Sequence, residues 1–159
     1  MLGVYVRVSK EEQNVSEQIK QGTAYAVLQG LEYRIYSDEG VSGSIPMHGR
    51  KAGSKLLHDI AIGGISSVWV QRVDRISREL LQSLGFWRLI EIKNAKIISG
   101  YEGVFEVGDG DKYFIYCLNS LLAERERMIL IKRTNDGLAR ARREGKKIGG
   151  GKKGRKWRR

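Results

Sequence analysis

The amino-acid sequence predicts an α/β fold, in which a mainly parallel sheet is flanked by helices and followed by one long C-terminal helix. Segments with strand character alternate with segments of helical apolar spacing over roughly the first hundred residues. Such alternation is typical of parallel sheets with right-handed crossover connections. Residues 111–146 then run without a proline, as a continuous helix requires.

The first part of the chain is predicted to hold two strands and two helices. The strands fall at residues 4–8 and 32–36, and the second runs into the turn-rich loop SDEGVSG, which carries Asp38. Apolar residues at helical spacing predict helices at 16–28 and 50–62, and glycines follow the end of each.

The next part adds two further strands and a third helix. SSVWVQRV, at residues 66–73, is the strongest strand pattern in the sequence. A helix is predicted at 74–92, and AKIISGYEG, at 95–103, predicts a fourth strand and its loop.

The long helix has an apolar series at helical spacing, formed by Ile115, Leu118, Leu122 and Ile129. At a rise of 1.5 Å per residue, about 35 residues span about 50 Å, more than the width of a body of about 110 residues. We therefore expect part of the helix to project. A second copy of the chain or the chain's own body are both candidates to cover its apolar face.

The charge is concentrated at the C-terminal end of the chain. The whole sequence carries a net charge of +11, whereas residues 125–159 alone hold 15 lysines and arginines against 3 acidic residues. One-sided charge of this kind indicates a polyanionic partner, with nucleic acid favoured over an acidic membrane surface. We expect an α/β domain at 1–110, a long helix at 111–147 and a basic tail at 148–159.

Other features narrow the class of protein. No apolar run approaches the ~20 residues of a membrane span, and the N-terminus lacks a signal-peptide pattern, which favours an intracellular, cytoplasmic protein. The single cysteine, Cys117, has no partner at metal-ligand spacing and is expected to be a buried thiol. No disulfide, structural zinc or other cofactor is expected.

Three loops should meet at one edge of the sheet, because parallel strands end on the same side. Ser9 follows the first strand, Asp38 the second, and DRISRE the third. In the last stretch Asp74 is predicted to cap a helix, with Arg75 and Arg78 on one face of its first turn. Two cations at a helix N-terminus are unfavourable unless an anion lies between them, so this pattern predicts a phosphate site.

Taken singly, these residues fit ordinary roles: a turn hydroxyl, a helix cap and surface charges. Together with Arg7, they supply a nucleophile and the guanidinium groups that phosphoryl transfer to a serine needs. A Ser-His-Asp hydrolase lacks its base, because His48 and His58 lie outside the strand-end motifs. GGGKKGRK is not a P-loop, and the carboxylates suffice for at most one ion, between Asp38 and Asp74.

Four motifs resemble the catalytic domain of the serine recombinases, the resolvase/invertase family. YVRVSKEEQNVSEQ resembles the family's opening Tyr-x-Arg-Val-Ser with two spaced glutamines, and DEGVSGS with the later Arg50 is similar to its flexible loop. VDRISRE resembles Leu-Asp-Arg-Leu-x-Arg, and AERERMILIKRTNDGLARARREGKKIG resembles the dimerisation helix. A valine stands before Asp74 where the family favours leucine.

The resemblance implies that Ser9 attacks a DNA phosphodiester without metal or ATP, leaving a 5′-phosphoserine link and a free 3′-hydroxyl. It further implies that Arg7, Arg50, Arg75 and Arg78 bind and activate the scissile phosphate. Gln13, Gln18 and Asp74 would support them, and Arg125 would reach in from the long helix. The expected partners are double-stranded DNA, a second copy in a homodimer, and a tetramer in the synaptic complex.

Family members continue into a separate DNA-binding domain, whereas here GGGKKGRKWRR follows Ile148. Either the chain is part of a longer protein, or its basic tail alone binds DNA. The basic residues expected at DNA are Arg140, Arg142, Arg143, Lys146, Lys147, Lys152, Lys153, Arg155 and Lys156. Resolvase, invertase, integrase and transposase stay open, as do a non-catalytic DNA-binding module and a hydrolase of small phosphates.

Overall fold

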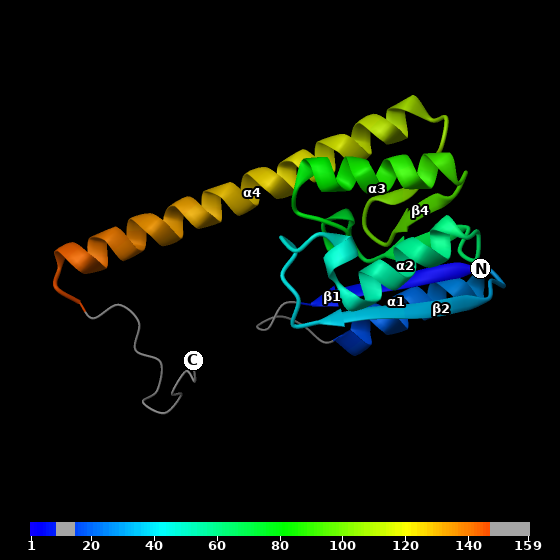
Figure 1. Cartoon of the computed structure of the whole chain (residues 1–159), viewed down its shortest axis with the longest axis horizontal. Coiled ribbons are helices and arrows are strands. Elements are labelled where there is room, and N and C mark those ends of the chain that lie inside the picture. Colours follow the sequence, from blue (N-terminus) through cyan, green and yellow to red (C-terminus); the bar gives the residue numbers. More distant parts are fainter. Residues whose placement is uncertain (9–14, 147–159) are drawn as a thin grey trace. The chain divides into compact units, whose positions relative to one another are not determined.

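The computed structural model describes residues 1–8 and 15–146 (Figure 1). It divides into two compact units, Met1–Glu124 and Arg125–Arg159. The first unit contains the sheet, its helices and the beginning of the long helix, and the second contains the rest of that helix. Ser9 and Gln13 lie outside the described residues, as does the chain from residue 147 onward.

The first unit is built on a five-stranded sheet in the order β2-β1-β3-β4-β5. Its strands are β1 (Leu2–Val8), β2 (Tyr33–Glu39), β3 (Ser67–Val70), β4 (Lys96–Ser99) and β5 (Gly103–Glu106). The first four pair in parallel, and β5 pairs antiparallel with β4. The mainly parallel α/β prediction is confirmed, and β5 is an edge strand that the sequence pattern missed.

Helices α1 (Val15–Leu28), α2 (Lys51–Ala61) and α3 (Leu80–Ile92) cover the two faces of the sheet. Because strand residues alternate between faces, Val4 and Val6 pack with α1 residues in one apolar cluster. Tyr5, between them in sequence, belongs to the larger cluster formed with α2 and α3. β1 is buried along its whole length, as expected for a central strand of a parallel sheet.

The prediction of a helix from residue 74 is wrong at its N-terminal end. Val73–Arg75 form a short 3₁₀ turn, and α3 begins only at Leu80, after Glu79 at its N-cap position. Asp74 is therefore not the cap of this helix, and Arg75 and Arg78 do not share a helix face. The apolar spacing that predicted one helix continues through a turn and an irregular segment, which periodicity alone does not distinguish.

The long helix, α4, spans Gly110–Arg143. Asp109 caps its start, since its Oδ1 accepts a hydrogen bond of 3.0 Å from the Lys112 N–H. Within the first unit Tyr116 is fully buried and donates its hydroxyl to the Ser83 carbonyl oxygen at 3.0 Å. The predicted apolar series stays partly exposed: Ile115 is 40 % exposed, Leu118 42 %, Leu122 44 % and Ile129 37 %.

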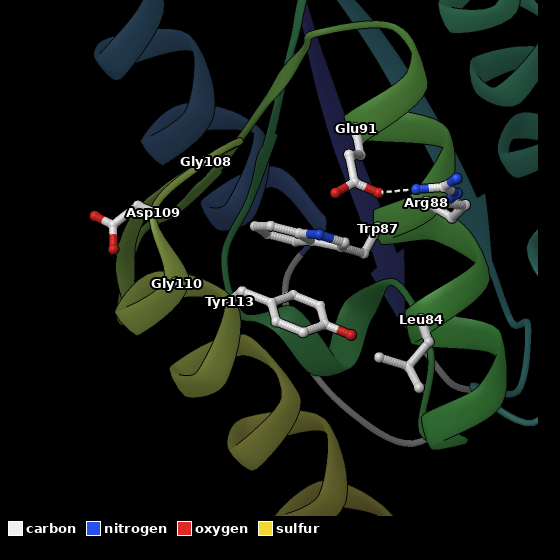
Figure 2. Close-up of a pocket in the computed structure, with 8 residues that line it drawn as sticks. All are labelled: Leu84, Trp87, Arg88, Glu91, Gly108, Asp109, Gly110 and Tyr113. Atoms are coloured by element: carbon white, nitrogen blue, oxygen red, sulfur yellow. Dashed lines mark hydrogen bonds and ion pairs between the residues drawn. The ribbon is translucent and has the colours of Figure 1, made fainter.

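A hollow of about 430 Å³ lies between α3 and the start of α4. Figure 2 shows the Trp87 and Tyr113 rings on its wall, with ring centroids 5.3 Å apart. Arg88 and Glu91 form an ion pair on its α3 side. The aromatic pair helps to fix the first turn of α4 against α3.

Among the described residues, no helix is long and apolar enough to cross a membrane.

Candidate active site

The site lies where β1, β2 and β3 end. In the strand register Tyr5 stands opposite Val70, the last residue of β3, and Arg7 stands opposite Asp38 of β2. β1 therefore continues past the end of β3, which brings Arg7 next to the turn that follows β3. The carboxyl edge of a parallel sheet is where ligands commonly bind in such folds.

Arg7 is fully buried and links two loops through their backbones. Its Nε donates to the Arg75 carbonyl oxygen at 3.1 Å, and its Nη2 donates to the Asp74 carbonyl oxygen at 3.2 Å. Its Nη1 donates to the Val41 carbonyl oxygen at 3.2 Å. A guanidinium has five N–H groups, so two of those of Arg7 have no acceptor in these bonds.

Arg50 is 2 % exposed and holds the loop before α2. Its Nε donates to the Ile45 carbonyl oxygen at 2.7 Å, and its Nη2 donates to the Gly43 carbonyl oxygen at 3.3 Å. Its Nη1 donates to the Tyr5 hydroxyl oxygen at 2.8 Å and to the Arg75 carbonyl oxygen at 3.1 Å. Arg50 thus connects the loop before α2, strand β1 and the turn after β3.

Asp38 lies inside β2 and not in the turn-rich loop predicted from the sequence. Its carboxylate accepts hydrogen bonds from the Ala52 N–H at 2.8 Å and the Gly53 N–H at 2.9 Å, and so caps α2. It also accepts a hydrogen bond of 2.9 Å from the Tyr5 hydroxyl. Burial raises the pKa of Tyr5 to about 12. With these three bonds the Asp38 carboxylate is a structural cap, which corrects its suggested role beside Asp74 as an ion ligand. The described residues contain no group of three or more histidine, cysteine or acidic side chains placed to hold a metal ion.

Asp74 lies close to the two other charged residues of the turn, Arg75 and Arg78. Its carboxylate lies 3.9 Å from Arg75 Nε and 3.8 Å from Arg78 Nε. Both distances are too long for hydrogen bonds. Asp74 Oδ1 and Arg75 Nε are buried and have no hydrogen-bond partner. The charges of this turn are close together but incompletely paired.

Arg7, Arg50, Arg75 and Arg78 form a cationic cluster, which we call the arginine cluster. Burial, together with the charges of Arg50, Arg75 and Arg78, lowers the pKa of Arg7 to about 10, and the charge of Asp74 opposes this shift. Gly43 lets the guanidinium groups approach, since a Cβ there would lie 2.9 Å from Arg7 Nη2 and 3.1 Å from Arg78 Cδ. A bound anion would relieve the mutual repulsion of these cations.

Gln18, on the first turn of α1, is 1 % exposed, and neither its Oε1 nor its Nε2 has a hydrogen-bond partner. Arg125 belongs to the second unit and is exposed there. Arg140, Arg142, Arg143 and Lys146 are likewise exposed. The other basic residues expected at DNA lie outside the described residues, as do Ser9 and Gln13 of the expected catalytic set.

Two residues that matter to this geometry were not singled out from the sequence. Tyr5 joins Asp38 to Arg50, and the only signal for it was its place in YVRVS, two residues before Arg7. Gly43 is part of the turn-rich SDEGVSG, where a glycine is ordinary, so its contact with two arginines had no sequence signal.

Comparison with known proteins identifies the family of the chain. The family model described as "Resolvase, N terminal domain" matches residues 2–147. The Tn917 transposon resolvase of Enterococcus faecalis is 33 % identical over 154 residues, covering 97 % of this chain and 78 % of that protein. A resolvase of Clostridium perfringens is 30 % identical over 151 residues, covering 94 % of this chain and 76 % of that protein.

Solved structures share the fold. The N-terminal catalytic domain of TP901-1 integrase superposes with a TM-score of 0.64 at 27 % identity, over 80 % of this chain and 97 % of that one. A resolvase family site-specific recombinase from Streptococcus pneumoniae has a TM-score of 0.58 at 22 % identity, over 89 % of this chain and 97 % of that one, and supports the fold alone. The chain belongs to the resolvase N-terminal domain family, and hence to the serine recombinases. It is a DNA recombinase of that family.

Proposed function

We propose that the chain is the catalytic part of a site-specific recombinase that cleaves and rejoins DNA through a 5′-phosphoserine intermediate on Ser9. In this reaction the Ser9 Oγ–P bond forms as the P–O3′ bond breaks, the serine loses its proton and the 3′-oxygen gains one. Because the phosphoserine retains the energy of the broken bond, attack by a 3′-hydroxyl rejoins the strand without ATP. The proposal requires no metal ion.

The observation that carries this proposal is the arginine cluster, with Arg7 and Arg50 buried, at the end of the strand that precedes Ser9. Arg7 lies two residues before Ser9 and is surrounded by three other cations and one incompletely paired carboxylate. Such a cluster is stabilised by a bound anion, and a phosphodiester matches guanidinium groups in charge and geometry. As the phosphate becomes pentacoordinate it gains charge, which preorganised cations stabilise further.

The arginines have different surroundings and therefore different proposed roles. Arg50 donates four hydrogen bonds within the protein and is 2 % exposed, so we propose that it positions the Tyr5 hydroxyl and the Arg75 carbonyl. Arg7 positions the same turn, and we assign to a phosphate its two N–H groups that make no hydrogen bond to the described residues. Arg78, 33 % exposed, and Arg75, 12 % exposed, are the more accessible cations for direct contact.

DNA and a second copy of the chain are the proposed partners. The partly exposed Ile115, Leu118, Leu122 and Ile129 of α4 are suited to pack against a second copy. Basic residues of α4 and the residues beyond it supply a net charge of +12 over residues 125–159, which suits a DNA backbone. Dimers would pair into a tetramer for synapsis, as the resemblance implies.

Trapping of the cleaved intermediate tests this function. The domain, fused to a sequence-specific DNA-binding domain, is incubated with nicked or supercoiled DNA that carries the fused domain's sites, and denatured products are separated. We expect protein linked to DNA 5′ ends, in EDTA as well as in its absence. Arg78→Ala should lower the adduct about 10²-fold, whereas Arg88→Ala, an exposed arginine on α3, should not. Cleavage without an adduct, or an adduct that EDTA abolishes, overturns the proposal.

A further inference from the structure

A second hollow adjoins the arginine cluster. It encloses about 360 Å³ and is lined by residues of α1, of the segment after β3 and of the segment after β4. Arg75 belongs both to its wall and to the arginine cluster, so the hollow begins where the cluster ends. A volume near the lower end of the range of small-molecule sites suits one nucleoside and not two.

The buried surface of this hollow carries polar groups without partners. Gln18 lines the hollow and is 1 % exposed, yet both its amide oxygen and its amide nitrogen lack hydrogen-bond partners. The Nε of Arg75 is unpartnered as well. By contrast, the Gln71 Nε2 donates to the Gln21 Oε1 at 3.1 Å on the same wall. Leaving a buried amide unpaired costs free energy, which a ligand with a donor and an acceptor would recover.

The rim of the hollow provides a flat surface. Tyr101 is 69 % exposed, and the Arg72 guanidinium lies 5.8 Å from the centre of its ring. Arg72 is held by Asp74 at 3.7 Å and by Glu102 at 3.9 Å, and the Tyr101 N–H donates to the Gln71 carbonyl oxygen at 3.2 Å. An exposed aromatic ring near a cation is a surface on which a nucleobase can stack.

We infer that this hollow binds the nucleoside whose 3′-oxygen leaves when the scissile phosphate is attacked. The inference rests on the proposed function, because it places that phosphate at Arg75. The base would stack on Tyr101, and the Gln18 amide would pair with a donor and an acceptor of the base or sugar, as glutamine does with adenine. Holding this nucleoside keeps its 3′-hydroxyl near the phosphoserine for rejoining.

A binding experiment tests the site without cleavage. The probes are 2′-deoxyadenosine 3′-monophosphate, its 5′-monophosphate isomer and inorganic phosphate, titrated into the isotopically labelled chain and followed by NMR. The 3′ isomer carries its phosphate on the oxygen that would leave, so it should bind about tenfold more tightly than phosphate or the 5′ isomer and shift the Tyr101 signals. Tyr101→Ala should abolish this preference, and Tyr33→Ala, an exposed tyrosine on β2, should keep it. Equal binding of the two isomers overturns the inference.

A cleavage experiment separates this inference from the proposed function. A substrate lacking the base on the 3′-oxygen side of the scissile phosphate should form the adduct about tenfold more slowly with the unmodified protein. In Tyr101→Ala the loss of that base should make no further difference, and Tyr101→Phe should behave like the unmodified protein. If the adduct forms but removal of the base slows its formation equally in Tyr101→Ala and in the unmodified protein, the nucleoside site is wrong and the serine mechanism stands. If no substrate gives an adduct, the mechanism is wrong, and the nucleotide titration still decides the site.

Discussion

Removing Arg50 should destabilise the first unit strongly, because its guanidinium connects three segments. Arg50→Ala leaves the carbonyl oxygens of Gly43 and Ile45 without this donor, together with the Arg75 carbonyl and the Tyr5 hydroxyl. A buried acceptor left unpaired costs about 1–3 kcal/mol. Arg75 O keeps its bond from Arg7, and water can enter part of the space, so we expect a total loss of about 3 kcal/mol.

The loss is measured as a change in the melting temperature. For a chain of this size about 3 kcal/mol corresponds to a fall of about 6–12 °C in thermal unfolding followed by circular dichroism. Arg50→Lys should recover little of it, because one ammonium group cannot reach four separated acceptors. The matched control is Arg88→Ala, whose side chain is 70 % exposed and whose ion pair with Glu91 should contribute little. An Arg50→Ala melting temperature within 2 °C of that control would refute the assigned role.

Three further outcomes follow from the structure. Gly43→Ala should reduce adduct formation about tenfold or more while the chain stays folded, because its Cβ displaces Arg7 and Arg78 from their phosphate-binding positions, where a single preorganised donor is worth ~10²-fold. The control, Gly85→Ala, has open space around the new Cβ and should leave activity unchanged. Equal rates of adduct formation in the two variants would contradict the contact of Gly43 with the arginines. Hydrogen bonds from Tyr36 at 2.5 Å and Arg34 at 2.9 Å lower the pKa of Asp59, so its stabilising contribution is present above the unfolded pKa of about 4 and is lost as pH falls through the folded value. Asp59→Asn should therefore flatten the dependence on acid pH of the free energy of urea unfolding. An unchanged pH dependence in this variant would argue against the role of Asp59. The double variant Leu118→Lys, Leu122→Lys should shift the sedimentation coefficient toward that of a monomer, while Lys112→Ala should not. A monomer of the unmodified protein at high concentration would contradict the dimer.

The sheet and helices were largely predictable from the sequence because their signals are local. Alternating apolar segments predicted β1, β2, β3 and β4 in sequence, and the proline-free run predicted α4. β5 has four residues of which Phe105 alone is buried, too short a pattern to separate from a loop. The turn at Val73–Arg75 was missed because it interrupts a run whose apolar spacing still suits a helix.

The arginines of the site were predictable as a set, but their arrangement was not. Strand order brings Arg7 to the turn that carries Arg75, as the shared edge of a parallel sheet implies. The bonds of Arg50 to Tyr5 and to three carbonyl groups depend on how the loop before α2 folds over β1, a non-local contact. The same holds for Asp38, whose role as a cap of α2 depends on how the chain between β2 and α2 brings the start of α2 back to β2 and leaves no pattern in the sequence.

The attachment site of DNA on the protein tests the central claim most directly. The denatured adduct is digested with nuclease and protease, and the peptide that retains a nucleotide through its 5′-phosphate is fragmented by tandem mass spectrometry. The account predicts the modification on Ser9, resolved from the nearby Ser16, and its absence from Ser9→Ala but not from Ser16→Ala. A nucleotide attached through its 5′-phosphate to any other residue, or an adduct that persists in Ser9→Ala, would contradict the account.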